Sequence, residues 1–330
     1  MPKLTLTLAC NDYDRTRPLM EGRVQPEGIA LNYLALPVEE IFWRMCRYEE
    51  FDASEMSFGA YNIYRSRPNP PFVAIPVFPS KFFRHSCVFI NAGSGVKRAE
   101  DLAGKRVGVP EYAMTAIVWM KGILADDHGV PPEKIHWFTG GLEQPGRKER
   151  VEFTPPPNVR IEDIGPNRTL NAMLEKGEID ALITARTPTA FMKGSPKVKR
   201  LWPDYKPVEM DYYRRTGCFP IMHCIAIRRS LHEAHPWVAQ SLYKAFCQAK
   251  ELCQQQLYDT SALRYMLPWM IQEVDEAREI FGPDIWAYGV EANRKNVETF
   301  TRYMYEQGLT TRRNTIDDLF PPSALTEFKI

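Results

Sequence analysis

One short segment restricts the fold of this chain more than any other. Residues 105–109 form a brief run with two β-branched valines, which Pro110 ends, and residues 114–124 carry apolar side chains at helical spacing before Gly129. The segment therefore predicts a strand, a turn and a helix. In an open α/β sheet such a turn faces the ligand crevice, and the free N–H groups of the next helix favour an anion. We expect residues 111–115 to meet a bound carboxylate there, the alternative being an ordinary βα unit without a ligand.

The rest of the chain continues this alternation of strands and helices. With short connections, that order predicts mostly parallel sheets covered by helices. Residues 140–157 are rich in Gly, Pro and charge and are expected to form a long irregular loop. Strands are predicted at 4–10, 29–36, 51–58, 72–77, 84–91, 159–164, 179–184 and 217–227, and helices at 37–47, 167–176 and from 236 onward.

Composition limits the kind of partner. At 330 residues the chain is long for one core, so two lobes are expected. Its 42 basic and 41 acidic side chains leave a net charge of +1, which gives no reason to expect a nucleic-acid partner. No apolar run reaches 18 residues, and a membrane span is not expected. The partner we expect is a small molecule, and the sequence leaves homo-oligomerisation open.

The compartment is inferred from the cysteines and the first residues. Seven cysteines, an odd number, follow no spacing pattern and are expected to be reduced, mostly buried thiols. The sequence around Cys10 superficially suggests a lipoprotein cleavage site, but threonines interrupt the leucines and Asp12 comes too early for an apolar signal core. We therefore expect no signal peptide and a cytoplasmic protein.

Several segments together resemble known families. The start 101–110, the run 170–182 and the strand end 225–230 before a Pro-initiated helix look like the type II periplasmic-binding-protein fold. In more detail the sequence resembles the 4,5-dihydroxyphthalate decarboxylase family. That resemblance is carried by Leu8-Ala-Cys-Asn-Asp-Tyr-Asp-Arg15, Glu55-Met-Ser-Phe58, Phe83-Arg-His-Ser86, Tyr288-Gly-x-x-x-Asn-Arg294 and Glu306-Gln-Gly-Leu309.

The resemblance implies an α/β fold of two lobes, each a mostly parallel sheet flanked by helices, with a ligand cleft between them. Lobe I is expected at 1–93 and 224–330, and lobe II at 94–223. The implied activity is decarboxylation of 4,5-dihydroxyphthalate, a small aromatic dicarboxylate, to protocatechuate in phthalate degradation. The alternatives are a non-catalytic solute-binding protein for an aromatic or small organic acid, or an enzyme of this fold with another substrate.

This reaction supplies its own electron sink. Each carboxylate of the substrate is para to a hydroxyl, so ring protonation and loss of the hydroxyl proton give a dienone from which carbon dioxide can leave. No organic cofactor is therefore expected, although a divalent metal ion on the catechol oxygens stays an alternative.

The reaction also defines the side chains to look for. Carboxylate binding points to Arg15, Arg84 and Arg186, and acid–base chemistry to His85 and His223, which the implied fold places at its two crossings between lobes. Each has a structural alternative: a surface ion pair for an arginine, and a core position for a histidine in an apolar strand. Glu111 is a second candidate acid or a solvated carboxylate at a helix start. Ser57, Tyr112 and Thr115 are candidate hydrogen-bond donors to the substrate.

Other catalytic signatures are missing from the sequence. The six histidines form no His-Glu-x-x-His pattern and the cysteines no Cys-x-x-Cys pair, so no built-in metal site is expected. The glycines form neither a dinucleotide-binding fingerprint nor a P-loop, and no Gly-x-Ser-x-Gly turn occurs.

Overall fold

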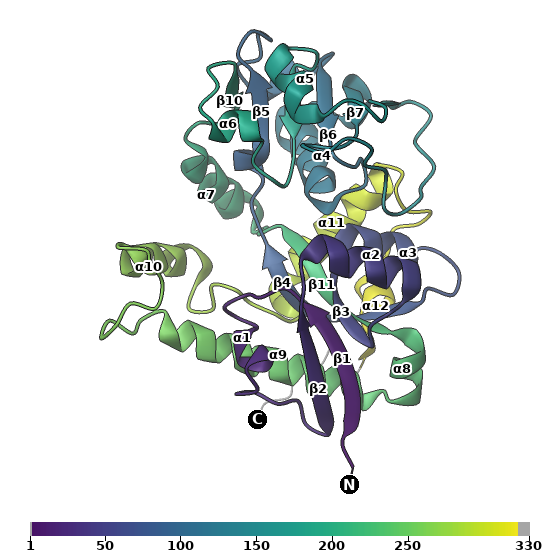
Figure 1. Cartoon of the computed structure of the whole chain (residues 1–330), viewed down its shortest axis with the longest axis vertical. Coiled ribbons are helices and arrows are strands. Elements are labelled where there is room, and N and C mark those ends of the chain that lie inside the picture. The colour runs from purple at the N-terminus through teal and green to yellow at the C-terminus, as the bar shows by residue number, and fades with distance from the viewer. Residues whose placement is uncertain (1, 323–330) are drawn as a thin grey trace. The chain divides into compact units, whose positions relative to one another are not determined.

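Two β-sheets with helices packed around them organise the chain in a computed structural model, which describes residues 2–322 (Figure 1). The chain groups into two units. Unit 1 contains residues 2–81, 223–298 and 314–322, and unit 2 contains residues 82–222 and 299–313. Residues 323–330, which the sequence assigns to lobe I, lie outside the described residues.

The sheet of unit 1 has five strands. Its order is β2 (Ile29–Ala35), β1 (Leu4–Cys10), β3 (Ala53–Ser57), β11 (Ile221–Arg228) and β4 (Phe72–Lys81). β1 is parallel to both β2 and β3, whereas β11 is antiparallel to β3. The helices that begin in this unit are α1 (Arg17–Met20), α2 (Val38–Tyr48), α3 (Phe58–Arg65), α8 (Arg229–Ala234), α9 (Trp237–Gln256), α10 (Met270–Phe281), α11 (Arg294–Glu306) and α12 (Ile316–Leu319).

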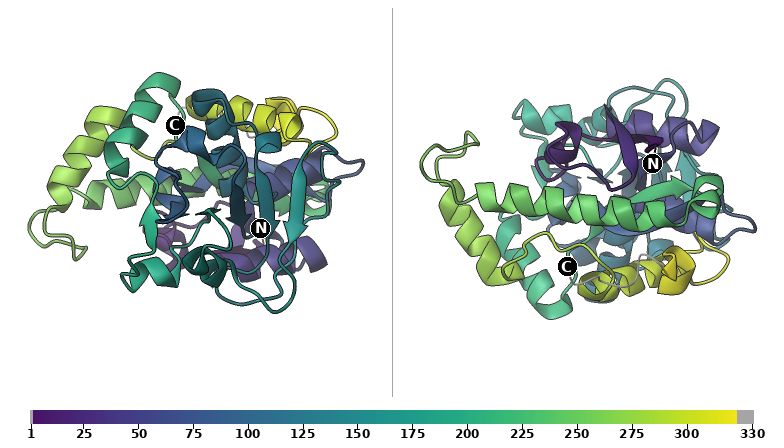
Figure 2. Two further views of the ribbon diagram at one scale, coloured as in Figure 1. Left: turned by 90° about the horizontal axis from the view of Figure 1, so that it is seen from above. Right: turned by 90° about the horizontal axis from the view of Figure 1, so that it is seen from below.

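Burial explains why these segments take up their positions in unit 1. β3 is buried along its whole length, so it occupies the middle of the sheet. α2 begins after Pro37 and buries Ile41, Phe42 and Met45 on one face. The 20-residue α9 packs against α1 and β4 and covers one part of the sheet (Figure 2).

The sheet of unit 2 has six strands. Its order is β10 (Val198–Arg200), β5 (Val88–Asn91), β9 (Ala181–Ile183), β6 (Arg106–Val109), β7 (His136–Thr139) and β8 (Arg160–Asp163). The neighbours from β9 to β8 are parallel, and β5 is antiparallel to both β9 and β10. Its helices are α4 (Thr115–His128), α5 (Leu170–Lys176), α6 (Thr189–Met192) and α7 (Tyr205–Thr216). Its 3₁₀ turns are η1 (His85–Cys87), η2 (Ala99–Leu102) and η3 (Pro132–Lys134). The turn η4 (Glu291–Asn293) belongs to unit 1.

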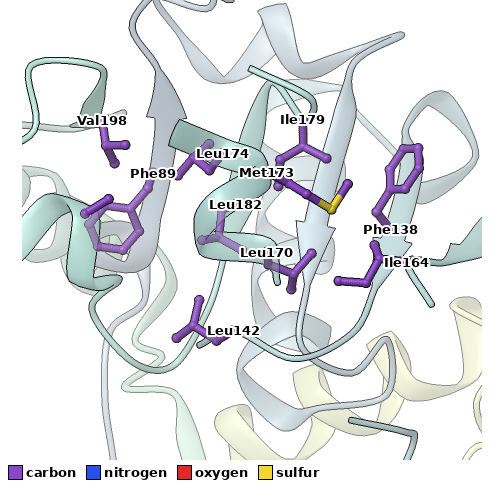
Figure 3. Close-up of a cluster of buried hydrophobic side chains, with 11 residues drawn as sticks. Phe89, Phe138, Leu142, Ile164, Leu170, Met173, Leu174, Ile179, Leu182 and Val198 are labelled. Atoms are coloured by element: carbon purple, nitrogen blue, oxygen red, sulfur yellow. The ribbon is translucent and has the colours of Figure 1, made fainter. Parts of the chain in front are cut away.

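A close helix–strand contact explains why position 108 of β6 is a glycine. A Cβ on Gly108 of β6 would lie 2.7 Å from Ile179 Cδ1 and 2.9 Å from Leu170 Cδ2. Both side chains belong to an apolar cluster in which α5 packs on the sheet (Figure 3). Glycine at 108 therefore lets α5 approach β6 closely.

The prediction of an α/β fold with two sheets flanked by helices is confirmed, and three details differ from expectation. The predicted strand 84–91 begins only at Val88, because residues 85–87 form a 3₁₀ turn that the hydrogen bond from Cys87 N–H to Arg84 O closes. β5 pairs within the second sheet, so residues 82–93 belong to unit 2, as do residues 299–313 of the C-terminal part. The polar stretch 195–215 contains β10 and most of α7, elements that the sequence did not predict.

Candidate functional site

Polar side chains gather at one edge of the sheet in unit 1. β1 and β3 are parallel and end at this edge, and β11 begins there because it is antiparallel to β3. Within the β3–β11 pair, His223 lies opposite Ser57, and Glu55 is two residues from Ser57 along β3. Side chains two residues apart on a strand share a face. The topology therefore places Glu55, Ser57 and His223 on one face at the end of the sheet.

Glu55 and His223 form the central pair of this edge. Nδ1 of His223 lies 2.5 Å from Oε1 of Glu55. The Glu55 side chain is completely buried, whereas the His223 side chain keeps 17% of its surface exposed. The ring of Phe42 on α2 meets the imidazole edge to face, with centroids 4.8 Å apart. A buried carboxylate thus holds one nitrogen of a histidine that is still reachable from solvent.

Three further donors surround the Glu55 carboxylate. Tyr13 Oη lies 2.7 Å from Oε1, while Asn11 N and Cys10 Sγ lie 3.0 and 3.6 Å from Oε2. Burial alone would raise the pKa of this carboxyl, but His223, Tyr13 and the Asn11 N–H lower it below its ordinary value. Burial, followed by the Glu55 charge, raises the pKa of Tyr13, which remains a neutral donor.

Arg15 is fixed beside this network. Its guanidinium lies over two aromatic rings, 4.3 Å from the centroid of Tyr13 and 4.1 Å from that of Trp286. Nε donates to Pro79 O at 2.7 Å, and Nη1 forms an ion pair with Asp14 at 3.0 Å. Arg15 is therefore a cation held in one orientation next to the Tyr13 ring.

Lys81 is a basic residue at the same edge that the sequence analysis missed. The backbone N–H of Arg229, the residue after β11, donates to the carbonyl oxygen of Pro71, the residue before β4. The two neighbouring strands therefore run antiparallel, and β4 ends where β11 begins. Lys81 is buried, and its Nζ donates to Ala287 O at 2.8 Å and to Asn293 Oδ1 at 2.6 Å. Burial lowers its pKa to about 7.

The predicted anion position in unit 2 is occupied by the chain itself. The carboxylate of Glu149, from the loop 140–157, accepts hydrogen bonds from the N–H groups of Tyr112 and Ala113 at the turn between β6 and α4. Burial first, and then the nearby charge of Glu111, raise the pKa of Glu149 to about 7. The turn therefore binds a carboxylate, as its N–H groups predict, but an internal one.

Glu111 is engaged in ion pairs. Its Oε1 lies 2.5 Å from Arg147 Nη2 and 3.2 Å from Arg150 Nη2, and its side chain is buried. Both arginines come from the loop that carries Glu149. A carboxylate held by two guanidinium groups is poorly suited to donate a proton.

Tyr112 and Thr115 are buried in unit 2. The Tyr112 ring stacks on Phe153, and Lys121 Nζ lies 3.1 Å from its centroid. The Tyr112 hydroxyl has no hydrogen-bond partner among the described residues.

The remaining three predicted residues also lie in unit 2. Arg84 is buried, donates to the sulfurs of Met222 and Cys87 at 3.2 and 3.7 Å, and stacks on Phe82. His85 is 2% exposed and packs against Trp202 and Tyr212; burial lowers its pKa to about 4. Arg186 is exposed, just after β9.

Of the nine predicted site residues, unit 1 brings Arg15, Ser57 and His223 to one edge, and the other six lie in unit 2. The sequence analysis missed Glu55, Tyr13 and Lys81 as site residues. An acidic residue in the middle of a predicted strand is a signal that could have identified Glu55, because a buried carboxylate needs partners.

Residues 2–322 contain no group of three or more His, Cys, Asp or Glu side chains placed to hold a metal ion. Every helix in the same range is too short or too polar to cross a membrane.

Comparison with known proteins gives one clear sequence relationship. The chain is 39% identical to the 4,5-dihydroxyphthalate decarboxylase of Comamonas testosteroni over 330 residues, which covers the whole of both proteins. It is 40% identical over 214 residues to the enzyme of the same name from Pseudomonas putida, covering 65% of this chain and 83% of the relative. No family model matches the chain.

Solved structures give the fold. The periplasmic aliphatic sulphonate binding protein SsuA of Escherichia coli matches with a TM-score of 0.54 and 13% identity, over 97% of this chain and 98% of SsuA. A Candida albicans protein with the generic periplasmic binding protein fold matches with a TM-score of 0.50 and 13% identity, over 100% and 99% of the two chains. At these identities the likeness shows the periplasmic-binding-protein fold alone.

Proposed function

The chain belongs to the 4,5-dihydroxyphthalate decarboxylase family, and from this membership we propose that it converts 4,5-dihydroxyphthalate to protocatechuate and carbon dioxide. The observation that carries the proposal is 39% identity to a decarboxylase of that name over the full length of both proteins. The Glu55–His223 pair supports it independently, because the reaction needs a proton-transfer group.

The proposed chemistry begins with a proton exchange on the ring. A base removes the proton of one hydroxyl, and an acid delivers a proton to the para ring carbon that bears the carboxylate. The resulting dienone makes that carboxylate vinylogous to a β-keto acid. Its C–C bond breaks, carbon dioxide leaves, and the electron pair returns through the ring to the oxygen, which is reprotonated. One proton thus replaces one molecule of carbon dioxide.

We assign the proton transfer to His223. Its exposed surface lets it reach a substrate, and its hydrogen bond to the buried Glu55 holds the ring in one orientation, as proton transfer requires. His85 is less suited, because its low pKa keeps it neutral near pH 7 and its side chain is almost completely buried. Glu111 is less suited because two arginines already engage its carboxylate.

Substrate binding is assigned to the other predicted residues. Arg15, Arg84 and Arg186 are the proposed carboxylate-binding groups, since a guanidinium fork matches a carboxylate. Ser57 lies opposite His223 and is the proposed hydrogen-bond donor nearest to it. Tyr112 and Thr115 are further proposed hydrogen-bond donors to the substrate.

The proposal also covers cofactor use and compartment. The dienone route needs no organic cofactor, and a divalent metal ion on the catechol oxygens is the alternative. All seven cysteines are thiols in the structure, which suits the reducing cytoplasm, and there the enzyme would serve phthalate degradation.

Carbon dioxide release tests the proposal. Purified, chelator-treated protein is given 4,5-dihydroxyphthalate, with phthalate and protocatechuate as control compounds. We expect release only from 4,5-dihydroxyphthalate. Release that returns only after a divalent metal is added supports the metal-assisted alternative. Tight binding without release would contradict the proposal and favour a solute-binding protein, and neither binding nor release would contradict the assigned substrate.

A further inference from the structure

We propose that Tyr13 is a positioning residue for His223 and acts through Glu55. The Tyr13 hydroxyl and the His223 imidazole share one oxygen of the Glu55 carboxylate. This arrangement keeps the histidine proton on Nδ1 and leaves Nε2 to exchange a proton with the substrate. This inference rests on the proposed function. Tyr13 itself need not touch the substrate, because its hydroxyl donates to Glu55 Oε1 at 2.7 Å.

The argument starts from the number of donors around Glu55. Tyr13 Oη and His223 Nδ1 face Oε1, and Asn11 N and Cys10 Sγ face Oε2. An ionised carboxylate only accepts hydrogen bonds and has about four acceptor positions. A backbone N–H can only donate, and the buried charge needs its donors. Four donors therefore satisfy an ionised Glu55, and Nδ1 of His223 must carry a hydrogen.

A hydrogen on Nδ1 determines how Nε2 of His223 can exchange a proton. With a hydrogen fixed on Nδ1, Nε2 accepts a proton in the neutral ring and donates it in the charged ring, so Nε2 is the atom that exchanges. The edge-to-face contact with Phe42 restrains the ring from flipping. His223 can then pass a proton at one atom without losing its orientation.

The position of the Tyr13 ring is restrained by its contact with Arg15. The Arg15 guanidinium lies over this ring and also over the ring of Trp286. Trp286 is anchored by its Nε1, which donates to Phe78 O at 2.9 Å. The Tyr13 ring is thus in contact with a guanidinium that is itself fixed, and its hydroxyl limits how the Glu55 carboxylate can turn.

Tyr13→Phe removes the hydroxyl and keeps the ring, so the contact between this ring and the Arg15 guanidinium is expected to remain. The matched control is Tyr64→Phe in the same unit, where the hydroxyl donates to Cys46 O at 3.2 Å, away from Glu55. We expect Tyr13→Phe to lower kcat about tenfold, as for one lost hydrogen bond to a charged group, with little change in KM. Tyr64→Phe should retain the wild-type kcat and KM.

Nitrogen NMR of the resting protein with ¹⁵N-labelled histidine gives a readout that needs no turnover. The His223 signals are assigned by their loss in His223→Gln. We expect a hydrogen on Nδ1 in the wild type, and a larger change of that signal in Tyr13→Phe than in Tyr64→Phe. A hydrogen on Nε2 alone in the neutral ring, or equal kcat in the two tyrosine variants, would overturn the inference. If the wild type releases no carbon dioxide, the proposed function fails, while the NMR result still decides the role of Tyr13.

Discussion

Nδ1 of His223 lies 2.5 Å from Oε1 of Glu55, although 168 residues separate the two in the chain. The pairing of β3 with β11 creates this contact, because it places His223 opposite Ser57 and on the same face as Glu55. The candidate acid–base group of the proposed reaction therefore depends on the register of two antiparallel strands.

His223→Gln tests the assigned proton transfer. Glutamine keeps a polar side chain of similar reach but cannot donate a proton as an acid, so we expect kcat to fall by about 10²–10⁴-fold with a much smaller change in KM. The control is His232→Gln, on α8 of the same unit, which should retain kcat. Steady-state kinetics of carbon dioxide release provide the measurement, and wild-type kcat in His223→Gln would remove this residue from the mechanism.

Arg84→Met tests carboxylate binding. Arg84 is a buried cation that forms no ion pair with a carboxylate among residues 2–322, and its contacts are two sulfurs and a ring. Methionine keeps the apolar stem and removes the charge. We expect KM to rise about tenfold or more, as for one lost charge-assisted hydrogen bond, with a smaller change in kcat.

The matched control for Arg84 is Arg98→Met, because the Arg98 side chain is 75% exposed and lies beside Glu100 and Asp101. This variant should leave KM unchanged. Equal KM values in the two arginine variants would show that Arg84 does not bind the substrate.

Glu149→Gln tests the internal carboxylate at the β6–α4 turn. The folded pKa of Glu149 is raised to about 7, above its ordinary value, so the folded protein holds this proton more tightly than the unfolded chain. The free energy of unfolding therefore falls as the pH rises from the pKa of Glu149 in the unfolded chain through its folded pKa of about 7. Glutamine mimics the protonated acid, and we expect it to stabilise the protein by roughly 2–3 kcal/mol at about pH 8, with little effect at about pH 4.

Calorimetric melting at the two pH values measures this effect. The control is Glu178→Gln, at an exposed position of the same unit, which should change the melting temperature little at either pH. A Glu149→Gln variant whose melting temperature differs from the wild type equally at both pH values would contradict the raised pKa.

Local sequence was sufficient to predict several elements of the fold. The alternating leucines of β1, the Pro-initiated α2 and the β6–α4 segment all appear close to their expected ranges, because periodicity and caps are local signals. Residues 84–87 were assigned wrongly to a strand: residues 85–87 form a 3₁₀ turn, in which Ser86 N–H donates to the distant Glu209, a partner that no local pattern indicates.

The site was predictable only in part. Arg15, Ser57 and His223 stand near strand ends, which local patterns can indicate, and the structure places all three at one edge of unit 1. The contact of His223 with Glu55 required the β3–β11 register, which no local pattern contains. In the same way, residues 140–157 were expected to form an irregular loop, but nothing in that composition predicts that Glu149 would occupy the anion position of a distant turn.

The most direct test of the central claim is turnover of 4,5-dihydroxyphthalate in deuterium oxide, with the product analysed by mass spectrometry and NMR. The proposed reaction predicts protocatechuate with a single deuterium on the ring carbon that carried the lost carboxylate, and one carbon dioxide for each product molecule. Unchanged 4,5-dihydroxyphthalate after incubation with folded, active-site-intact protein, with or without a divalent metal, would contradict the account.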